Sequence, residues 1–101
     1  MNPAVFTGRA RRDILMATQW MAKDNPLVAQ ALREAIKQAA ILLGNYPLSG
    51  RERPDLVNGS YRFLAITGFS YVLVYDSLPR PPIVVRVIHG ARDLPALMDD
   101  F

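Results

Sequence analysis

Three consecutive stretches between Ser60 and Asp93 place the strongest constraint on how this chain can fold. They span residues 60–67, 70–76 and 83–89; each is rich in β-branched and aromatic residues and is about as long as a typical strand. The joins are short, so neighbouring strands are expected to pair antiparallel as a meander. Because an isolated sheet would leave an apolar face in water, the N-terminal half is expected to cover it.

The N-terminal half has helical periodicity in two segments, residues 9–23 and 26–43. The first segment has one stripe of small and apolar side chains: Ala10, Ile14, Ala17 and Met21. In the second, Asn25 is expected to be the N-cap, and Gly44 is expected to lie just past the end of the helix. The joint between the segments is so short that the helices should form an antiparallel hairpin.

The remaining segments complete the predicted fold. Residues 3–7 are expected to form a brief first strand, and residues 44–60 a long irregular connection. Residues 93–101 could form a short C-terminal helix with Asp93 as N-cap, and its inward side chains would be Leu94, Leu97 and Met98. The prediction for residues 1–101 is one α+β domain: a short N-terminal strand, a two-helix antiparallel hairpin packed on an antiparallel β-meander, and a short C-terminal helix.

Both faces of the last strand are apolar, as expected for a central strand covered on both sides. Strict alternation would place two sets of side chains on opposite faces: Ile83, Val85, Val87 and His89 on one, and Val84, Arg86 and Ile88 on the other. An arginine between apolar neighbours needs an acceptor if it is buried. Asp76 and Asp93 are the expected acceptors for Arg86.

Composition narrows the functional classes. Half of the 101 residues are hydrophobic and 21% are charged, which is typical of a soluble globular protein. We expect no membrane span and no signal peptide. The absence of cysteine excludes disulfides and thiolate catalysis and fits the cytoplasm; with a single histidine, a zinc site is not expected. The net charge of +3, carried mostly by arginine, indicates that the partner could be anionic.

The residues that could contact a partner or perform chemistry lie on or near the meander: Arg51, Arg53, Arg62, Arg86, His89 and Arg92. His89 could act as a general acid or base on RNA while the arginines hold a phosphate. The residue type and position are more typical of a histidine that forms only a structural hydrogen bond at a strand end. The first turn of the first helix also carries Arg9, Arg11 and Arg12, which oppose the helix dipole. They are either a solvated face or are retained for a reason other than helix stability.

Several motifs, in order and spanning nearly the whole chain, resemble the RelE/ParE toxins of type II toxin–antitoxin systems. They are residues 6–14, 24–26, 50–56, 59–62, 71–75 and 86–93. The last of these, Arg-Val-Ile-His-Gly-Ala-Arg-Asp, is most similar to the ParE (plasmid-stabilisation) branch. The fold that this resemblance implies agrees with the one predicted above from strand and helix patterns.

The branch decides the chemistry that the resemblance implies. RelE-type members are ribosome-dependent messenger-RNA endonucleases, whereas ParE-type members are poisons of DNA gyrase that lack the catalytic residues. Val72 occupies the place of an arginine in the ribonuclease pattern, Leu64 is expected opposite it, and no tyrosine follows Arg92. His89 is the one position that still matches a histidine-type nuclease.

The resemblance therefore implies a cytoplasmic toxin that inhibits DNA gyrase by binding, that is not an enzyme, and that needs no cofactor or metal. A cognate antitoxin, of ribbon-helix-helix type or similar, would lay an extended or helical segment across the hairpin and the sheet. One alternative is a ribosome-dependent RNA endonuclease that uses His89. Another is an inactive remnant that only binds the antitoxin.

Overall fold

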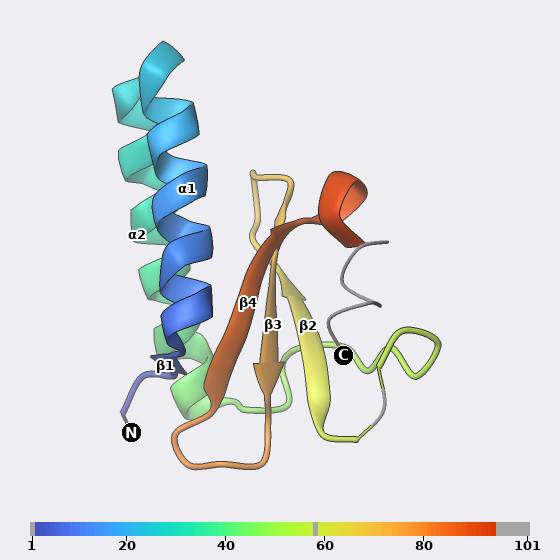
Figure 1. Cartoon of the computed structure of the whole chain (residues 1–101). Helices are drawn as coiled ribbons and strands as arrows, with labels where there is room; N and C mark the ends of the chain where they lie inside the picture. Colours follow the sequence, from blue (N-terminus) through green and yellow to red (C-terminus); the bar gives the residue numbers. More distant parts are fainter. Residues whose placement is uncertain (1, 58, 95–101) are drawn as a thin grey trace.

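Two helices lie side by side against a four-stranded sheet (Figure 1). The computed structural model describes residues 2–57 and 59–94. The elements in chain order are β1 (Val5–Phe6), α1 (Gly8–Asp24), α2 (Pro26–Asn45), β2 (Tyr61–Ala65), β3 (Tyr71–Asp76) and β4 (Ile83–His89). Residues 90–94 continue directly into a helical turn. The α+β architecture predicted from the sequence is confirmed.

The helical hairpin begins and turns at residues whose side chains cap it. The Thr7 hydroxyl accepts a hydrogen bond from the N–H of Ala10 at 3.1 Å and starts α1. Asn25 ends α1 through its own N–H, which donates to the carbonyl of Met21 at 2.8 Å. Its side chain also accepts from Val28 N–H at 3.2 Å, so the same residue starts α2, as predicted.

Gly44 does not follow α2, as the sequence suggested, but lies buried within its last turn. A Cβ built at this position would lie 2.1 Å from the carbonyl oxygen of Asn2. The glycine is therefore needed because the N-terminal segment crosses the helix at very short range. This close approach is a feature of the tertiary structure, but it requires glycine, the same residue that helix ends favour.

The sheet has the order β1-β4-β3-β2. Strands β2, β3 and β4 pair antiparallel, which confirms the meander, and β1 joins the edge of β4 in parallel. The first strand has only two residues, and Val5 and Phe6 pair with Ile83 and Val84. Beyond Val84, the outer edge of β4 faces α1 rather than another strand.

The predicted alternation along β4 is wrong because a β-bulge interrupts the pairing with β3. Val74 pairs with Arg86, and Tyr75 pairs with Val84, which leaves Val85 as an extra residue. Val84 and Val87 consequently pack on the helix side of the sheet, whereas Val85 packs on the opposite side. The residues Ile83, Val84 and Val85 gave no signal for the bulge, because all three are apolar and any of them can face either cluster.

Apolar side chains cover both faces of the central strands, as predicted. The cluster on the helix side includes the fully buried Leu32, Leu43, Leu73, Tyr75 and Val84. On the opposite face a smaller cluster joins the long loop to the sheet through Val57, Phe63, Val74 and Ile88. Leu94 packs against this second cluster, as expected, while Leu97 and Met98 lie outside the described residues.

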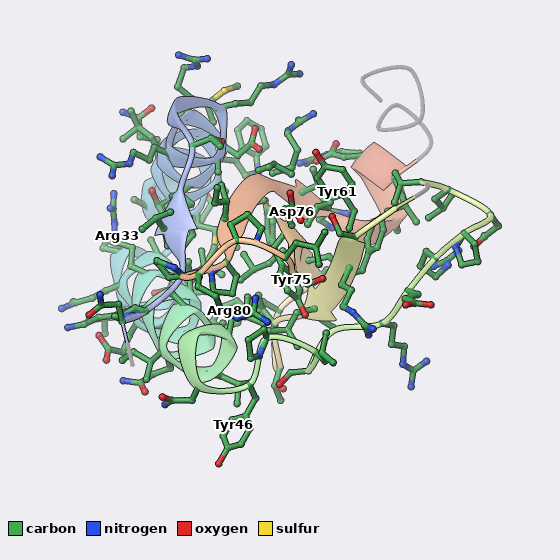
Figure 2. The ribbon with its side chains drawn as sticks, turned by 90° about the horizontal axis from the view of Figure 1, so that it is seen from below. Arg33, Tyr46, Tyr61, Tyr75, Asp76 and Arg80 are labelled. Carbon is green, nitrogen blue, oxygen red and sulfur yellow. The ribbon has the colours of Figure 1, made fainter. Side chains whose placement is uncertain are left out.

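Tyr75 attaches the loop between α2 and β2 to the core. Its hydroxyl donates to the carbonyl of Pro47 at 2.7 Å and accepts from Gly50 N–H at 2.8 Å. Burial raises the pKa of the Tyr75 phenol, although the Gly50 hydrogen bond partly opposes that shift. Figure 2 shows Tyr75 within the body of the molecule, whereas Tyr46 at the end of α2 points away from it.

Candidate functional site

A groove of about 520 Å³ runs between α1 and the outer edge of β4. We call it the α1–β4 groove. Its α1 wall consists of Arg9, Arg12, Met16 and Trp20. The opposite wall consists of Tyr71, Arg86, Val87, Arg92 and Asp93, and Asp13 and Ala17 of α1 also line the groove. The groove thus combines arginines with exposed apolar side chains.

Asp13 joins the two sides of the groove. Its Oδ2 atom accepts from Arg86 Nε at 2.8 Å and from the backbone N–H of Val87 at 2.9 Å. Both side chains of this ion pair are only 16% exposed, so water screens the pair weakly. The expectation that Asp76 or Asp93 would accept from Arg86 is wrong, because α1 brings Asp13 to the edge of β4 from 73 residues away.

A second aspartate protects the next outward N–H of β4. Asp93 Oδ2 accepts from His89 N–H at 2.9 Å, and Asp93 Oδ1 pairs with Arg92 Nε at 3.0 Å. The Arg92 guanidinium, followed by the His89 N–H, lowers the pKa of the Asp93 carboxyl. Asp13 and Asp93 therefore use carboxylates to satisfy the edge N–H groups that β1 does not reach.

His89 caps the helical turn that follows β4. Its Nδ1 accepts from the backbone N–H of Arg92 at 3.1 Å, which in a neutral ring places the proton on Nε2. The ring meets Tyr71 edge-on, with 5.5 Å between ring centroids. The prediction that Asp93 would be the N-cap is wrong, since Asp93 lies inside the turn and reaches back to His89 N–H.

The structure separates the six residues proposed from the sequence. Arg86, His89 and Arg92 lie in or beside the α1–β4 groove. Arg51 and Arg53 border another hollow, of about 390 Å³, together with Val72 and Leu94; we call it the loop hollow. Arg53 pairs there with Asp55 at 2.9 Å, and Arg51 forms a single antiparallel bridge with Phe63.

Arg62 belongs to neither site. Its guanidinium donates to the carbonyl of Gly50 at 2.9 Å and to Glu52 at 3.1 Å, and so holds the loop against β2. The sequence places this residue with the other candidates because all of them lie on or near the predicted meander. The order β4-β3-β2 places a whole strand between β2 and β4.

Most of the groove residues were not among the six candidates, including Asp13, Met16 and Trp20. One signal was present. Arg9 and Arg12 stand in the first turns of α1, where cations oppose the helix dipole, and both line the groove. No group of three or more carboxylates and imidazoles within residues 2–57 and 59–94 could hold a metal ion. Nor is any described helix long and apolar enough to cross a membrane.

Comparison with solved structures identifies a protein with the same fold. A chain of the chromosomal ParDE TA system from P. aeruginosa superposes with a TM-score of 0.73 at 17% identity, covering 88% of this chain and 96% of that one. The fold is thus that of a protein from a toxin–antitoxin system.

Sequence comparison then identifies the family. The family model for the ParE toxin of type II toxin–antitoxin systems, parDE, matches residues 4–94. Toxin RelE2 of Caulobacter vibrioides is 32% identical over 92 residues, which cover 91% of this chain and 99% of that protein. The chain belongs to the ParE toxin family of type II toxin–antitoxin systems, as the motifs indicated.

Proposed function

We propose that this toxin arrests growth by binding DNA gyrase in the cytoplasm, without cleaving RNA, and that a cognate antitoxin neutralises it. Membership of the ParE family supports the toxin role. Two observations support binding over RNA cleavage: His89 is separated from the loop arginines Arg51 and Arg53, and Arg86 and Arg92 beside it are bound by Asp13 and Asp93. A metal-independent nuclease needs a base and cations around the same phosphate.

His89 and the loop arginines occupy opposite faces. His89 pairs with Tyr71, which belongs to the cluster on the helix side. Directly paired residues share a face of an antiparallel sheet, so the imidazole is on that side as well. Arg51 and Arg53 instead line the loop hollow with Val72, which packs on the other face. A phosphate held by these arginines would therefore lie away from the imidazole.

The sequence suggested that Leu64 would lie opposite Val72, which occupies the position of the arginine in the ribonuclease pattern. It pairs instead with Leu73, and Ala65 pairs with Val72. On its own face, Val72 packs against the apolar side chains of the smaller cluster. The position that carries an arginine in the ribonuclease pattern is thus occupied by a side chain that packs in the smaller core.

An antitoxin is supported by the apolar side chains that the helical hairpin exposes. Met16 is 70% exposed, Trp20 66% and Leu27 77%. Trp20 and Leu27 lie close to the turn between α1 and α2, and Met16 precedes Trp20 by about one helical turn. This end of the hairpin extends past the sheet in Figure 1. Bulky apolar side chains gathered on one element are typical of a surface that a partner covers. A segment that orders as it binds could extend from the hairpin to the sheet edge.

Expression of the toxin from a controlled promoter tests the proposal. We expect growth arrest, DNA damage and inhibition of gyrase supercoiling by the purified chain, with no new messenger-RNA ends on translating ribosomes. The variant His89→Gln should keep toxicity if the amide oxygen replaces Nδ1 as the acceptor for Arg92 N–H. New RNA ends at the ribosomal A-site that disappear in His89→Gln would instead establish the nuclease.

The same experiment addresses the inactive-remnant alternative. Normal growth with verified soluble expression would remove the toxin activity from the proposal. Co-expression of the neighbouring antitoxin gene then separates two outcomes. Restored growth supports neutralisation, whereas a complex formed without any effect on growth supports the remnant.

A further inference from the structure

We propose that a pocket between the N-terminal segment and the helical hairpin binds a single-chain fatty acid, with the carboxylate at its mouth and the alkyl chain on its floor. We call it the N-terminal pocket. Its volume is about 330 Å³, and its lining includes Ala4, Phe6, Ile14 of α1 and residues of α2 between Arg33 and Ile41. It shares no lining residue with the α1–β4 groove or the loop hollow, and the inference goes beyond the proposed function.

The floor of the pocket is apolar. Ala4, Ile36 and Ala40 line it and are at most 5% exposed. The N–H of Ala4 donates to the carbonyl of Ala40 at 2.9 Å, so these two backbone groups satisfy each other. Phe6 and Ile14 are partly buried and extend the apolar lining. This floor favours hydrocarbon, because none of these side chains offers a polar atom to a ligand.

The mouth of the pocket is positively charged. Arg33 and Lys37 line it, are both exposed, and lie about one turn apart on the same side of α2. Ile41 follows about one turn later and is 37% exposed, so this row of side chains changes from cationic to aliphatic. At about 1.5 Å per residue, the row spans about 12 Å along the helix axis. A ligand that follows it needs an anionic group at one end and hydrocarbon at the other.

No carboxylate among the described residues offsets these two cations. Arg33 donates to the hydroxyl of Thr18 at 2.9 Å, which is a neutral partner. Glu34, the nearest carboxylate along α2, accepts from Gln38 at 3.2 Å. None of the ion pairs within residues 2–57 and 59–94 includes Arg33 or Lys37. In the α1–β4 groove, by contrast, aspartates already bind two of the arginines. The charge at the N-terminal pocket is therefore available to an anionic ligand.

A fatty acid fits these features better than a phospholipid or a nucleic acid does. The volume is close to the lower end of the range for small-molecule sites, about 300 Å³, which suits one alkyl chain. A lipid with two chains would leave the second chain in water. A nucleic acid would bring phosphates over the apolar floor, where they lose water without gaining a partner. A carboxylate matches the planar guanidinium of Arg33, and Lys37 can provide a second donor.

Titration of the purified full-length chain with alkyl carboxylates, followed by NMR, tests the inference. Octanoate should bind about tenfold more tightly than hexanoate, because each buried methylene group contributes about a fourfold gain in affinity. Octanol, which has the same chain without the charge, should bind at least about fivefold more weakly than octanoate. Equal affinities for hexanoate and octanoate would overturn the inference, because the alkyl chain would not be buried. Equal affinities for octanoate and octanol would overturn it too, because the cations would have no role.

Amide chemical shifts locate the bound octanoate. The largest changes are expected at Ala4, Lys37 and Ile41, which line the pocket. The amide of Ala4 should also exchange with solvent more slowly, since the ligand covers its hydrogen bond to Ala40. Changes concentrated around the exposed Trp20 would show binding to the hairpin surface and would refute the pocket.

Two matched pairs of variants assign the contacts. Lys37→Gln should weaken octanoate binding by about fivefold or more, whereas Lys23→Gln, at the other lysine of the chain, should leave it unchanged. Ile41→Ala should weaken binding by a similar factor. Its control is Leu42→Ala, at a neighbour of similar exposure that does not line the pocket. A control that weakens binding as much as its pocket counterpart would refute the assignment. Circular dichroism confirms that each variant is folded.

A peptide distinguishes a fatty acid from a protein segment as the ligand. A short peptide that ends in two leucines with a free carboxyl group offers similar chemistry, but its backbone amides would lose water over the apolar floor. We therefore expect it to bind more weakly than octanoate. Tighter binding of the peptide would overturn the fatty acid in favour of a protein segment. These measurements do not depend on toxicity, so the pocket and the gyrase proposal can each fail while the other stands.

Discussion

The α1–β4 groove contains one arginine–aspartate pair that joins distant segments, Asp13 with Arg86, whereas the pair at the border of the loop hollow joins near neighbours. In the groove, Asp13 and Asp93 bind arginines and also accept from backbone N–H groups at the outer edge of β4. In the loop hollow, Arg53 pairs with Asp55 two residues away, and both side chains are well exposed. From this comparison we expect an ion pair to stabilise the fold most when it joins distant segments and satisfies a backbone group as well.

Of the variants considered, Asp13→Ala should lower the free energy of unfolding most. It removes the Asp13 carboxylate from the partly buried Arg86 guanidinium and takes away the acceptor of Val87 N–H. We expect the free energy of unfolding, measured with urea, to fall by about 2–4 kcal/mol. Asp24→Ala removes an exposed aspartate of the same helix and serves as the control. Equal losses in the two variants would show that Asp13 does not hold α1 against β4.

Tyr75→Phe should cause the next largest loss of stability. It tests whether the Tyr75 hydroxyl attaches the loop between α2 and β2 to the core. The substitution leaves Pro47 C=O and Gly50 N–H without the buried hydroxyl, at a cost of about 1–3 kcal/mol. Faster hydrogen exchange at Gly50 should accompany the loss. Tyr46→Phe, which alters a tyrosine that is 66% exposed, should be neutral. An unchanged Gly50 exchange rate in Tyr75→Phe would contradict the role assigned to the hydroxyl.

Asp93, the second aspartate of the groove, should contribute less to stability, and its contribution should be lost at acid pH. Because the pKa of Asp93 is lowered in the folded chain, its contribution is complete above the unfolded value, about 4, and is lost as the pH falls through the folded value. Solvent screens a side chain that is 36% exposed, so the contribution is at most about 1 kcal/mol. The acid limb of the stability curve should be shallower in Asp93→Asn. An unchanged limb would mean that Asp93 titrates as it does in the unfolded chain.

Asp55→Asn should have the smallest effect. Arg53 lowers the pKa of Asp55 through their hydrogen bond, but water surrounds both groups. The urea midpoint is expected to stay within experimental error at neutral pH. A measurable loss of stability would remove the distinction drawn here between the two sites.

Most of the fold could be predicted from the sequence because its signals are local. Helical periodicity, the Asn25 cap and the runs of β-branched residues each involve neighbours in the chain. The misinterpretations occurred where a distant contact has the same residue preference as a local one. Gly44 suggested a helix end, but it is required by the approach of Asn2. Asp93 suggested an N-cap, but the capping side chain is His89.

By itself, the sequence determined the order and type of the elements, the antiparallel meander and the family. Periodicity and motif order are properties of the chain that do not depend on how the elements pack. Only the tertiary structure decided which arginines share a site. The bulge at Val85 reassigns the faces of β4, and the docking of α1 brings Asp13 to Arg86. Both depend on the placement of helix against strand to within a hydrogen-bond length, and residues 73 positions apart carry no local pattern that specifies such a distance.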